Sequence, residues 1–240
     1  MKYFFSSSAR AYDMLKELGA TNFLLSFAVD AKEAPKMISD YNEIIIDSGA
    51  FSVWNKGGSI DIDEYLEFCK SLPEEWTYIN LDVIPETGSS QEDIDKCCEQ
   101  GYENYLYLKQ HLKNVMPVYH YGDNIKWLHK FVETSDYIGI SPANDTHEYV
   151  KRKFLCEVFD VLKDNVKTHA LGYSSFDGLK MFPFYSVDSI SFKKSKINGT
   201  QFWNEDSKLW FYLRKRIKEF LKIQRDITEI WEYRGTTWNK

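Results

Sequence analysis

Aspartate residues stand at the ends of three apolar runs that lie far apart in the sequence. Asp47 follows the run EIII, Asp82 follows INL, and Asp188 lies within YSVDSIS. His120 ends a similar run, VMPVYH. Carboxylates serve as nucleophiles or carry protons as general acids and bases, and imidazole exchanges protons near neutral pH. An aspartate after a strand also commonly caps the next helix or begins a turn, so chemistry requires that these side chains meet.

Eight short β-like runs alternate with segments of helical periodicity along the chain. This alternation predicts parallel strands with crossover helices, and eight repeats predict an α/β fold, a single closed (β/α)8 TIM barrel. The expected strands are 2–7, 22–29, 43–49, 77–84, 115–122, 137–142, 167–173 and 185–192. The expected helices are 9–19, 61–72, 90–114, 124–135 and 148–165, followed by a basic C-terminal helical segment at about 203–233.

A barrel of this type builds its active site at the C-terminal ends of its strands. That rule places Asp47, Asp82 and Asp188 at one mouth, although they come from three different strands. Polar residues expected at the same mouth are His120, Asp123, Ser141 and Asn144. Because like charges that gather without a function cost stability, their convergence favours a functional site.

Length and composition favour one compact domain over residues 1–240. The chain is 43% hydrophobic and 16% aromatic, which is ample for a core and excludes a disordered chain. No stretch approaches the roughly 20 apolar residues of a membrane span, so we expect a soluble, unprocessed, cytoplasmic protein without a membrane partner. The cysteines lie in expected helices without C-x-x-C pairs, which favours buried free thiols over a zinc site.

Charge is divided unevenly along the chain. Residues 193–240 carry 12 Lys and Arg against 6 Asp and Glu, a net charge of +6 that leaves −12 for residues 1–192. This asymmetry is compatible with a polyanion held by the C-terminal part. A solvated amphipathic helix has the same pattern, so charge alone does not separate the two interpretations.

Six segments, in their order along the chain, resemble those of the queuine and archaeosine tRNA-guanine transglycosylases. DSGAF (47–51) resembles the family's D-S-G-G-F signature, and VDSISF (187–192) resembles its nucleophile strand. The segments that match between them are LDVIP (81–85), MPVYHYG (116–122), YIGISPA (137–143) and ALGYSS (170–175). Members of this family are (β/α)8 barrels that exchange a guanine in nucleic acid for a 7-deazaguanine base. The resemblance covers about residues 43–192, and its specificity comes from the order of short motifs.

The resemblance implies a role for each matching residue. Asp188 would be the nucleophile that attacks C1′, and Asp47 the acid and base that also binds the exchanged base. Asp82 would accept hydrogen bonds from the N1–H and N2–H₂ edge of guanine. Phe51 and Leu171 would sandwich the purine, unless they simply pack in the core, and His120 would either contact the base substituent or fill space. The remaining residues expected around the base are Ser48, Gly49, Gly139, Ser141 and Gly172.

Departures from the family bear on the expected substrate. The tRNA enzymes carry a zinc site of three cysteines and one histidine near the C-terminus, whereas this chain has no cysteine after Cys156 and no histidine after His169. The chain therefore looks closer to the zinc-free phage and bacterial DNA transglycosylases. That likeness implies DNA as the acceptor ahead of tRNA, no cofactor or metal, and room for an accessory protein. Residues expected to hold phosphates are Lys193, Lys194, Lys196, Arg214 and Arg216.

Two other classes of function stay open from the sequence. His120, His169, Asp82 and Asp188 are residue types that suit a metal-dependent barrel hydrolase. Against it, the first strand ends without an H-x-H pair, and His169 lies early in its strand, toward the other end of the barrel. The second class is a barrel that binds a purine or nucleic acid without turning it over.

Overall fold

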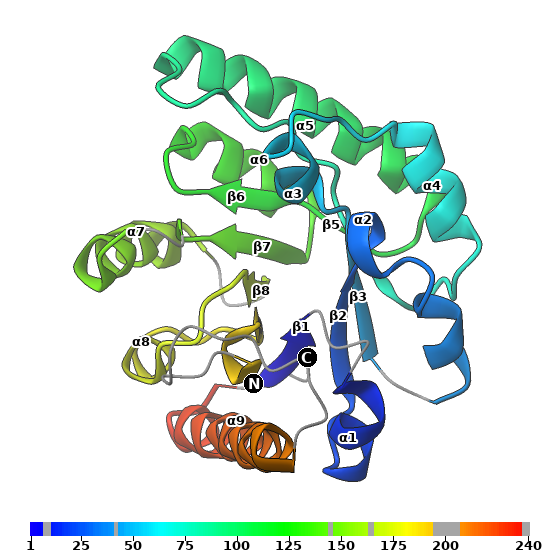
Figure 1. The fold of residues 1–240 in the computed structure, drawn as a ribbon. Helices are drawn as coiled ribbons and strands as arrows, with labels where there is room; N and C mark the ends of the chain where they lie inside the picture. Colours follow the sequence, from blue (N-terminus) through cyan, green and yellow to red (C-terminus); the bar gives the residue numbers. More distant parts are fainter. Residues whose placement is uncertain (7–10, 41–42, 144–145, 163–165, 194–206, 237–240) are drawn as a thin grey trace.

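The structure is a computed structural model of the chain, and it describes residues 1–6, 11–40, 43–143, 146–162, 166–193 and 207–236. Its centre is a parallel β-sheet that curves into a barrel, with helices on the outside (Figure 1). The described strands are β1 Lys2–Ser6, β2 Asn22–Ser26, β3 Glu43–Asp47, β4 Thr77–Ile79, β5 Val115–Met116, β6 Val118–His120, β7 Tyr137–Ser141, β8 Lys167–Ala170 and β9 Ser186–Ser189. Their order in the sheet is β5-β4-β3-β2-β1-β9-β8-β7-β6.

The two edge strands of this sheet, β5 and β6, are halves of one segment separated by Pro117. β5 pairs with β4 on one side, and β6 pairs with β7 on the other. Proline has no N–H to donate, so it interrupts the ladder, but the Pro117 carbonyl still accepts a 2.8 Å hydrogen bond from Gly139 N. Residues 115–120 therefore bridge β4 and β7, and the eight expected strands form a TIM-barrel-like (β/α)8 fold.

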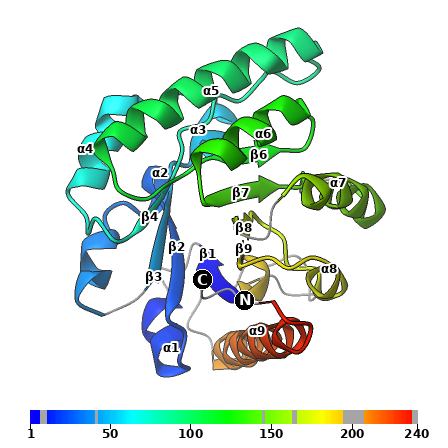
Figure 2. The same ribbon diagram turned by 180° about the vertical axis from the view of Figure 1, so that it is seen from behind.

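Helices surround the sheet and cover its outer face (Figures 1 and 2). The described α-helices are α1 Tyr12–Glu17, α2 Phe27–Asp30, α3 Ala50–Trp54, α4 Ile62–Lys70, α5 Gln91–His111, α6 Ile125–Thr134, α7 Glu148–Val161, α8 Phe176–Met181 and α9 Ser207–Tyr233. Two short 3-10 helices are η2 Ala34–Asp40 and η3 Ser191–Lys193. Several begin at side-chain caps: Asp61 caps α4, Ser90 caps α5 and Asn124 caps α6.

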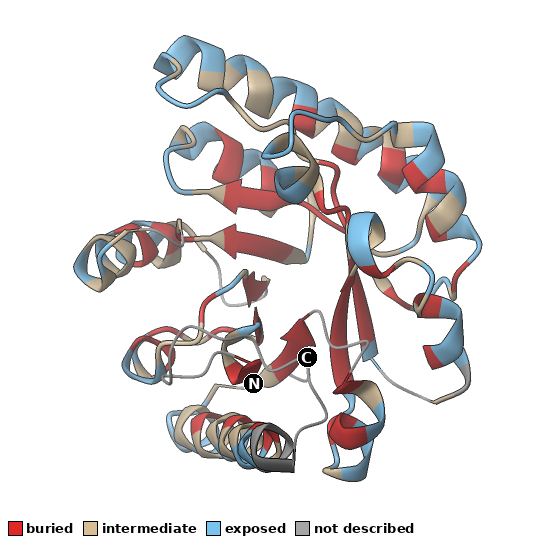
Figure 3. Cartoon of the chain, in the orientation of Figure 1, coloured by how far each residue is buried: buried red, intermediate tan, exposed pale blue. Residues whose placement is uncertain are grey.

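Alternation along the strands creates two apolar clusters, one inside the barrel and one outside. Successive side chains of a strand point to opposite faces, so every second residue faces the barrel interior. The interior cluster consists of Phe4, Leu24, Ile45, Ile79, Met116 and Val118. The larger cluster lies between strands and helices and includes Tyr3, Phe5, Ile44, Ile46 and Tyr78. Figure 3 shows the strands buried and each long helix buried only on the side that faces them.

Helix α9 closes the ring of helices beside β1 and α8 (Figure 2). Its buried residues Leu213, Ile217, Phe220 and Ile227 recur at helical spacing and form the face that packs on the core. The amine of Met1 donates a 2.9 Å hydrogen bond to Thr228 Oγ1, which ties the first strand to this helix. The helical part of the expected C-terminal segment is therefore confirmed for residues 207–233.

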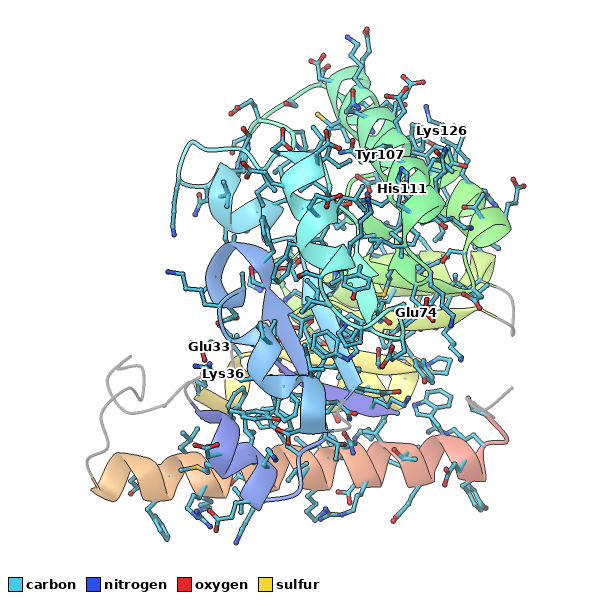
Figure 4. The ribbon with its side chains drawn as sticks, turned by 90° about the vertical axis from the view of Figure 1, so that its right-hand side faces the viewer. Glu33, Lys36, Glu74, Tyr107, His111 and Lys126 are labelled. Atoms are coloured by element: carbon cyan, nitrogen blue, oxygen red, sulfur yellow. The ribbon has the colours of Figure 1, made fainter. Side chains whose placement is uncertain are left out.

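Charged side chains cover the solvent face of the outer helices. Figure 4 shows Glu33, which directly precedes η2, beside Lys36 of η2. Lys126 on α6 reaches Asp95 Oδ2 of α5 at 2.6 Å. Exposed pairs of this kind contribute about 0–1 kcal/mol each. Their role is to keep the outer layer polar. None of the described helices is long and apolar enough to cross a membrane.

The structure shortens several expected elements and adds others. The second expected strand ends at Ser26 because residues 27–30 turn into α2, and the fourth ends at Ile79, so Asp82 lies in the segment after β4. Helices α2, α3, α8 and η2 are not predicted by the sequence. These helices have 4 to 7 residues, too few to display a helical period.

Candidate active site at the barrel mouth

The C-terminal ends of the strands, called the mouth below, carry a layer of polar side chains above the interior cluster. Phe4, Ile45 and Val118 face the barrel interior, and two residues further along the same strands come Ser6, Asp47 and His120. Because the side-chain period of a strand is two residues, these polar groups point into the mouth. The alternation that fills the barrel with apolar side chains therefore also places the candidate residues.

Asp47 has an unusual electrostatic environment at the end of β3. Burial raises its pKa to about 7, the negative charges of Asp188, Asp82 and Asp30 act in the same direction, and a hydrogen bond from the Gly49 N–H opposes them. Charges affect each other this way only when they lie close together. Asp47, Asp82 and Asp188 are thus brought to one place, as the barrel rule predicts. At neutral pH Asp47 is able both to donate and to accept a proton.

The turn that follows Asp47 depends on glycine. Gly49 has φ +78°, and a Cβ atom there would lie 2.5 Å from Ser26 Oγ and 2.7 Å from Ala28 Cβ. The positive φ and the two close contacts both require a residue without a side chain at position 49. Ser48 beside it is buried and donates a 3.1 Å hydrogen bond to the Asn80 carbonyl, which links the ends of β3 and β4.

Asp188 on β9 is buried and surrounded by hydrogen-bond donors. Ser6 Oγ donates to its Oδ2 atom, and the backbone N–H of Gly172 donates to Oδ1 at 2.8 Å. His169 Nε2 lies 3.3 Å from the same Oδ1. Ser6 and Gly172 therefore hold the two carboxylate oxygens in place. Gly172 was expected to allow the close approach of a backbone amide or of the base, and in the structure its own N–H approaches Asp188.

His169 corrects the sequence analysis. Its place early in the strand suggested the far end of the barrel, yet its Nε2 atom reaches the candidate nucleophile. His169 points inward because it is two residues before Leu171, whose side chain packs against the interior cluster. The same parity rule applied to β1 would have found Ser6, which the sequence analysis also missed.

His120 on β6 lies between two carboxylates. Its Nε2 atom is 3.4 Å from Asp82 Oδ2, and its Nδ1 atom is 3.4 Å from Asp123 Oδ2. Burial of the ring favours the neutral form, but Asp123 and Asp82 outweigh it and raise the pKa of His120 to about 10. The pKa of Asp123 falls despite its burial because His120 donates to it. His120 is therefore a cationic clamp that holds the loop after β6 against Asp82.

Asp82 is oriented by a buried amide. Asn80 is 1% exposed, and its Nδ2 atom donates to Asp82 Oδ1 and to the Gly101 carbonyl, both at 2.9 Å. The Asn80 side chain thus ties the segment after β4 to α5. The Asp82 side chain keeps 17% of its surface exposed, so it remains accessible from the mouth.

The other residues expected around the base serve in different ways. Phe51 on α3 is 62% exposed at the rim of the mouth. Gly139 lies inside the barrel, where a Cβ atom would be 3.0 Å from Val118 Cγ2 and 3.1 Å from Leu171 Cδ1. These two side chains already fill the space that Gly139 leaves, so it serves interior packing. Ser141 ends β7 beside His120, its partner in the sheet register.

Most of the basic residues expected to hold phosphates have other partners in the structure. Arg214 binds Glu17 with both terminal nitrogens, at 2.7 and 2.6 Å, and Arg216 binds Glu219 and the Ser191 carbonyl. Lys193 is 5% exposed, and its charge acts on Asp30, whose pKa is raised by burial. A buried lysine is not available to an external phosphate. Lys194, Lys196 and Asn144 lie outside the described residues.

Metal ligands and cysteine thiols are the other candidate reactive groups. Among the described residues, no group of three or more His, Cys, Asp or Glu side chains could hold a metal ion. The four cysteines are free, as expected, but Cys69 alone is buried and Cys156 is exposed on α7. Burial raises the pKa of Cys69 to about 12, so that thiol is unreactive at neutral pH.

A cavity of about 880 Å³ lies at the opposite end of the barrel. Residues at the N-terminal ends of the strands line it, among them Glu43, Thr77, Val115, Tyr137 and Lys167. Lys2 is paired with Glu43 at this end, and Glu75, Glu133 and Asp136 also line the cavity. The carboxyl group whose pKa burial raises to about 7, that of Asp47, lies at the mouth instead. We therefore place the candidate site at the mouth, where the perturbed groups converge.

Comparison of the sequence with protein-family models and with curated proteins gives no match.

Proposed function

We propose that the protein is a base-exchange transglycosylase that replaces a guanine in nucleic acid by a 7-deazaguanine through a covalent Asp188 ester. The observation that carries the proposal is the convergence of Asp47, Asp82 and Asp188 at the mouth of a (β/α)8 barrel. This arrangement matches the roles implied by the resemblance to the guanine transglycosylases. The activity belongs in the cytoplasm, where nucleic acid and free base are both present.

The reaction needs a nucleophile and a proton carrier. An Asp188 oxygen attacks C1′ of the nucleotide, the C1′–N9 bond breaks, and Asp47 gives a proton to the departing guanine. The incoming base then loses a proton to Asp47, its N9 attacks C1′, and the ester bond to Asp188 breaks. A group with a pKa of about 7 suits both proton transfers, because it is half protonated at neutral pH.

Base recognition falls to Asp82. A carboxylate oriented by Asn80 presents its oxygens to the N1–H and N2–H₂ donors of guanine, a pair that adenine lacks. His120 keeps Asp82 in place and neutralises part of its charge. This division separates the residue that reads the base from the residue that reacts.

The acceptor is DNA first and tRNA second. The absence from the sequence of the C-terminal zinc ligands of the tRNA enzymes favours DNA. Exposed aromatic side chains follow three different strands at the mouth: Phe51, Tyr121 and Phe176. Such side chains stack on unpaired bases without reading their sequence. A duplex would have to present its guanine out of the stack.

The test is to trap the covalent intermediate. Purified protein is incubated with a guanine-containing oligodeoxynucleotide or a tRNA transcript, together with a guanine analogue that stalls the second step. Products are separated under denaturing conditions. We expect a protein–nucleic acid adduct with the wild type and none with Asp188→Asn. Asp136→Asn, the same substitution at an exposed position at the other end of the barrel, is the control and should form the adduct normally.

Base composition of the nucleic acid completes the test. Mass spectrometry of nucleosides from DNA and tRNA, after incubation with labelled guanine or a 7-deazaguanine, identifies the acceptor. Equal adduct yields from the wild type and Asp188→Asn would refute the assignment of the nucleophile. Tight binding of nucleic acid without exchange or adduct would identify a binding protein instead.

A further inference from the structure

A chain of polar groups leads through the barrel from its N-terminal end, at Tyr137, to Asp188. The Tyr137 hydroxyl lies 2.5 Å from Ser186 Oγ, and Ser186 Oγ lies 2.6 Å from His169 Nδ1. The other ring nitrogen, Nε2, lies 3.3 Å from Asp188 Oδ1. Strands β7, β9 and β8 each contribute to this chain, named here the Tyr137–Ser186–His169 chain.

The ring of His169 has no freedom to turn. Its side chain is fully buried, and the rings of Phe4 and Tyr137 contact it edge-on at centroid distances of 5.7 and 6.4 Å. Ser186 is likewise fully buried. A ring held in this way keeps Nε2 directed at Asp188 throughout a reaction.

The proton positions follow from the order of the chain. Burial raises the pKa of Tyr137, which keeps its hydroxyl protonated, and Ser186 Oγ is the acceptor that this hydroxyl reaches, so we assign Tyr137 as the donor of the pair. Ser186 then donates to Nδ1, which leaves the proton of a neutral imidazole on Nε2. Nε2 is completely buried and makes no hydrogen bond of regular geometry to the described residues, although Asp188 Oδ1 lies 3.3 Å away. A buried N–H without a partner is costly, and Asp188 is the acceptor within reach.

We propose that His169 is a positioning residue that donates its Nε2–H to Asp188 and holds the reacting carboxylate in one orientation, with Ser186 and Tyr137 setting the tautomer. This inference rests on the proposed transglycosylase activity for its kinetic consequence, but the tautomer itself does not depend on that activity. His169 does not contact the substrate. It acts by removing rotational freedom from the nucleophile and by holding one of its oxygens, so that Oδ2 beside Ser6 is directed to C1′.

Two substitutions separate this role from simple packing. His169→Gln keeps an amide nitrogen near the place of Nε2, whereas His169→Asn keeps only the group that contacts Ser186. At saturating nucleic acid, we expect the rate of adduct formation to fall about ten- to a hundredfold in His169→Asn. In His169→Gln, the logarithm of this rate should recover at least half of that fall. The concentration of nucleic acid at half saturation should change less than threefold in both.

A measurement that does not need catalysis completes the experiment. Long-range ¹H–¹⁵N correlation spectra of the labelled protein distinguish the two protonation sites of each histidine, and the spectrum of His169→Gln assigns the signal of His169. We expect a proton on Nε2 in the wild type and a loss of that preference in Ser186→Ala. If the His169 variants do not fold, replacement of each of the other four histidines in turn assigns the His169 signal by elimination, and the wild-type and Ser186→Ala spectra then decide the question.

The outcomes separate the two proposals. An unprotonated Nε2 in the wild type, or equal losses of adduct formation in His169→Asn and His169→Gln, would overturn the role of His169. If no acceptor gives an adduct with the wild type while Nε2 carries the proton, the transglycosylase proposal fails and the hydrogen bond to Asp188 stands.

Discussion

The Nε2 atom of His120 lies 3.4 Å from Oδ2 of Asp82, across the mouth from β6 to the segment after β4. Asp123 holds the other ring nitrogen at the same distance. The imidazolium is therefore part of the framework of the site, and its ionisation links the mouth to the stability of the fold.

Replacement of His120 should have an effect on stability that depends on pH. The pKa of His120 is about 10 in the folded protein, despite burial, because of Asp123 and Asp82, and the ordinary value is 6.5. The charged His120 therefore stabilises the folded state fully below about pH 6.5, and this stabilisation is lost as pH rises through 10. We expect His120→Gln to lower the free energy of unfolding by about 1–2 kcal/mol at pH 6 and by much less at pH 10. Urea unfolding at both pH values measures it, with the exposed His129→Gln as a control that should differ little from the wild type.

Asp47→Asn should stabilise the protein at alkaline pH. Burial, with help from neighbouring carboxylates, raises the pKa of Asp47 to about 7, so the folded state holds a proton that the unfolded chain releases near pH 4. The free energy of unfolding therefore falls as pH rises from about 4 to 7. Asparagine has no proton to lose, and the variant should gain on the order of 2 kcal/mol at pH 8 and nothing at pH 4. A destabilised variant at pH 8 would contradict this assignment.

The same pKa predicts how adduct formation responds to pH. Departure of guanine requires protonated Asp47, so the rate should fall up to tenfold per pH unit above about pH 7. Single-turnover rates of adduct formation between pH 5.5 and 9 measure this fall. In Asp47→Asn the rate of adduct formation should be low, and its fall above about pH 7 should disappear. A wild-type rate that rises steadily through pH 8 would exclude Asp47 as the acid.

Gly49→Ala should damage the mouth more than an ordinary glycine replacement does. The new Cβ atom would overlap Ser26 and Ala28, in addition to the strain of a positive φ. We expect a loss of about 2–4 kcal/mol in the free energy of unfolding, together with loss of adduct formation. Gly57→Ala is the matched control, because Gly57 has φ +76° and open space around its Cβ position. It should lose about 1 kcal/mol and keep its activity. Similar losses in the two variants would show that the contacts of Gly49 do not matter.

Phe51→Ala should weaken nucleic-acid binding without destabilising the fold. Its ring is 62% exposed at the mouth, so its removal costs little packing. Loss of one stacking contact should weaken binding of a single-stranded oligonucleotide about five- to a hundredfold. Fluorescence anisotropy measures the affinity, and Tyr233→Ala, at the exposed end of α9, is the control. Unchanged affinity in Phe51→Ala would remove Phe51 from the acceptor site.

The barrel and the meeting of Asp47, Asp82 and Asp188 were predictable from the sequence. Strand alternation is a local property, and the rule that parallel strands end on one side of a barrel turns it into a prediction about distant residues. The Asp-Ser-Gly turn was equally readable, since Gly49 stands where the chain leaves β3. Short helices such as α3 and α8 were not, because a few residues do not display a period.

Only the tertiary structure decided which partners the polar residues have. The sequence by itself determined the strand ends, the apolar faces of the long helices and the types of residue at the mouth. It did not determine that His169 points at Asp188, that His120 lies between Asp82 and Asp123, or that Lys193 is buried and Arg214 is paired with Glu17. Those contacts depend on the register between neighbouring strands and on how the closed barrel brings separate loops together. The pKa of each group depends in turn on burial and on charges from other strands, which no single segment contains.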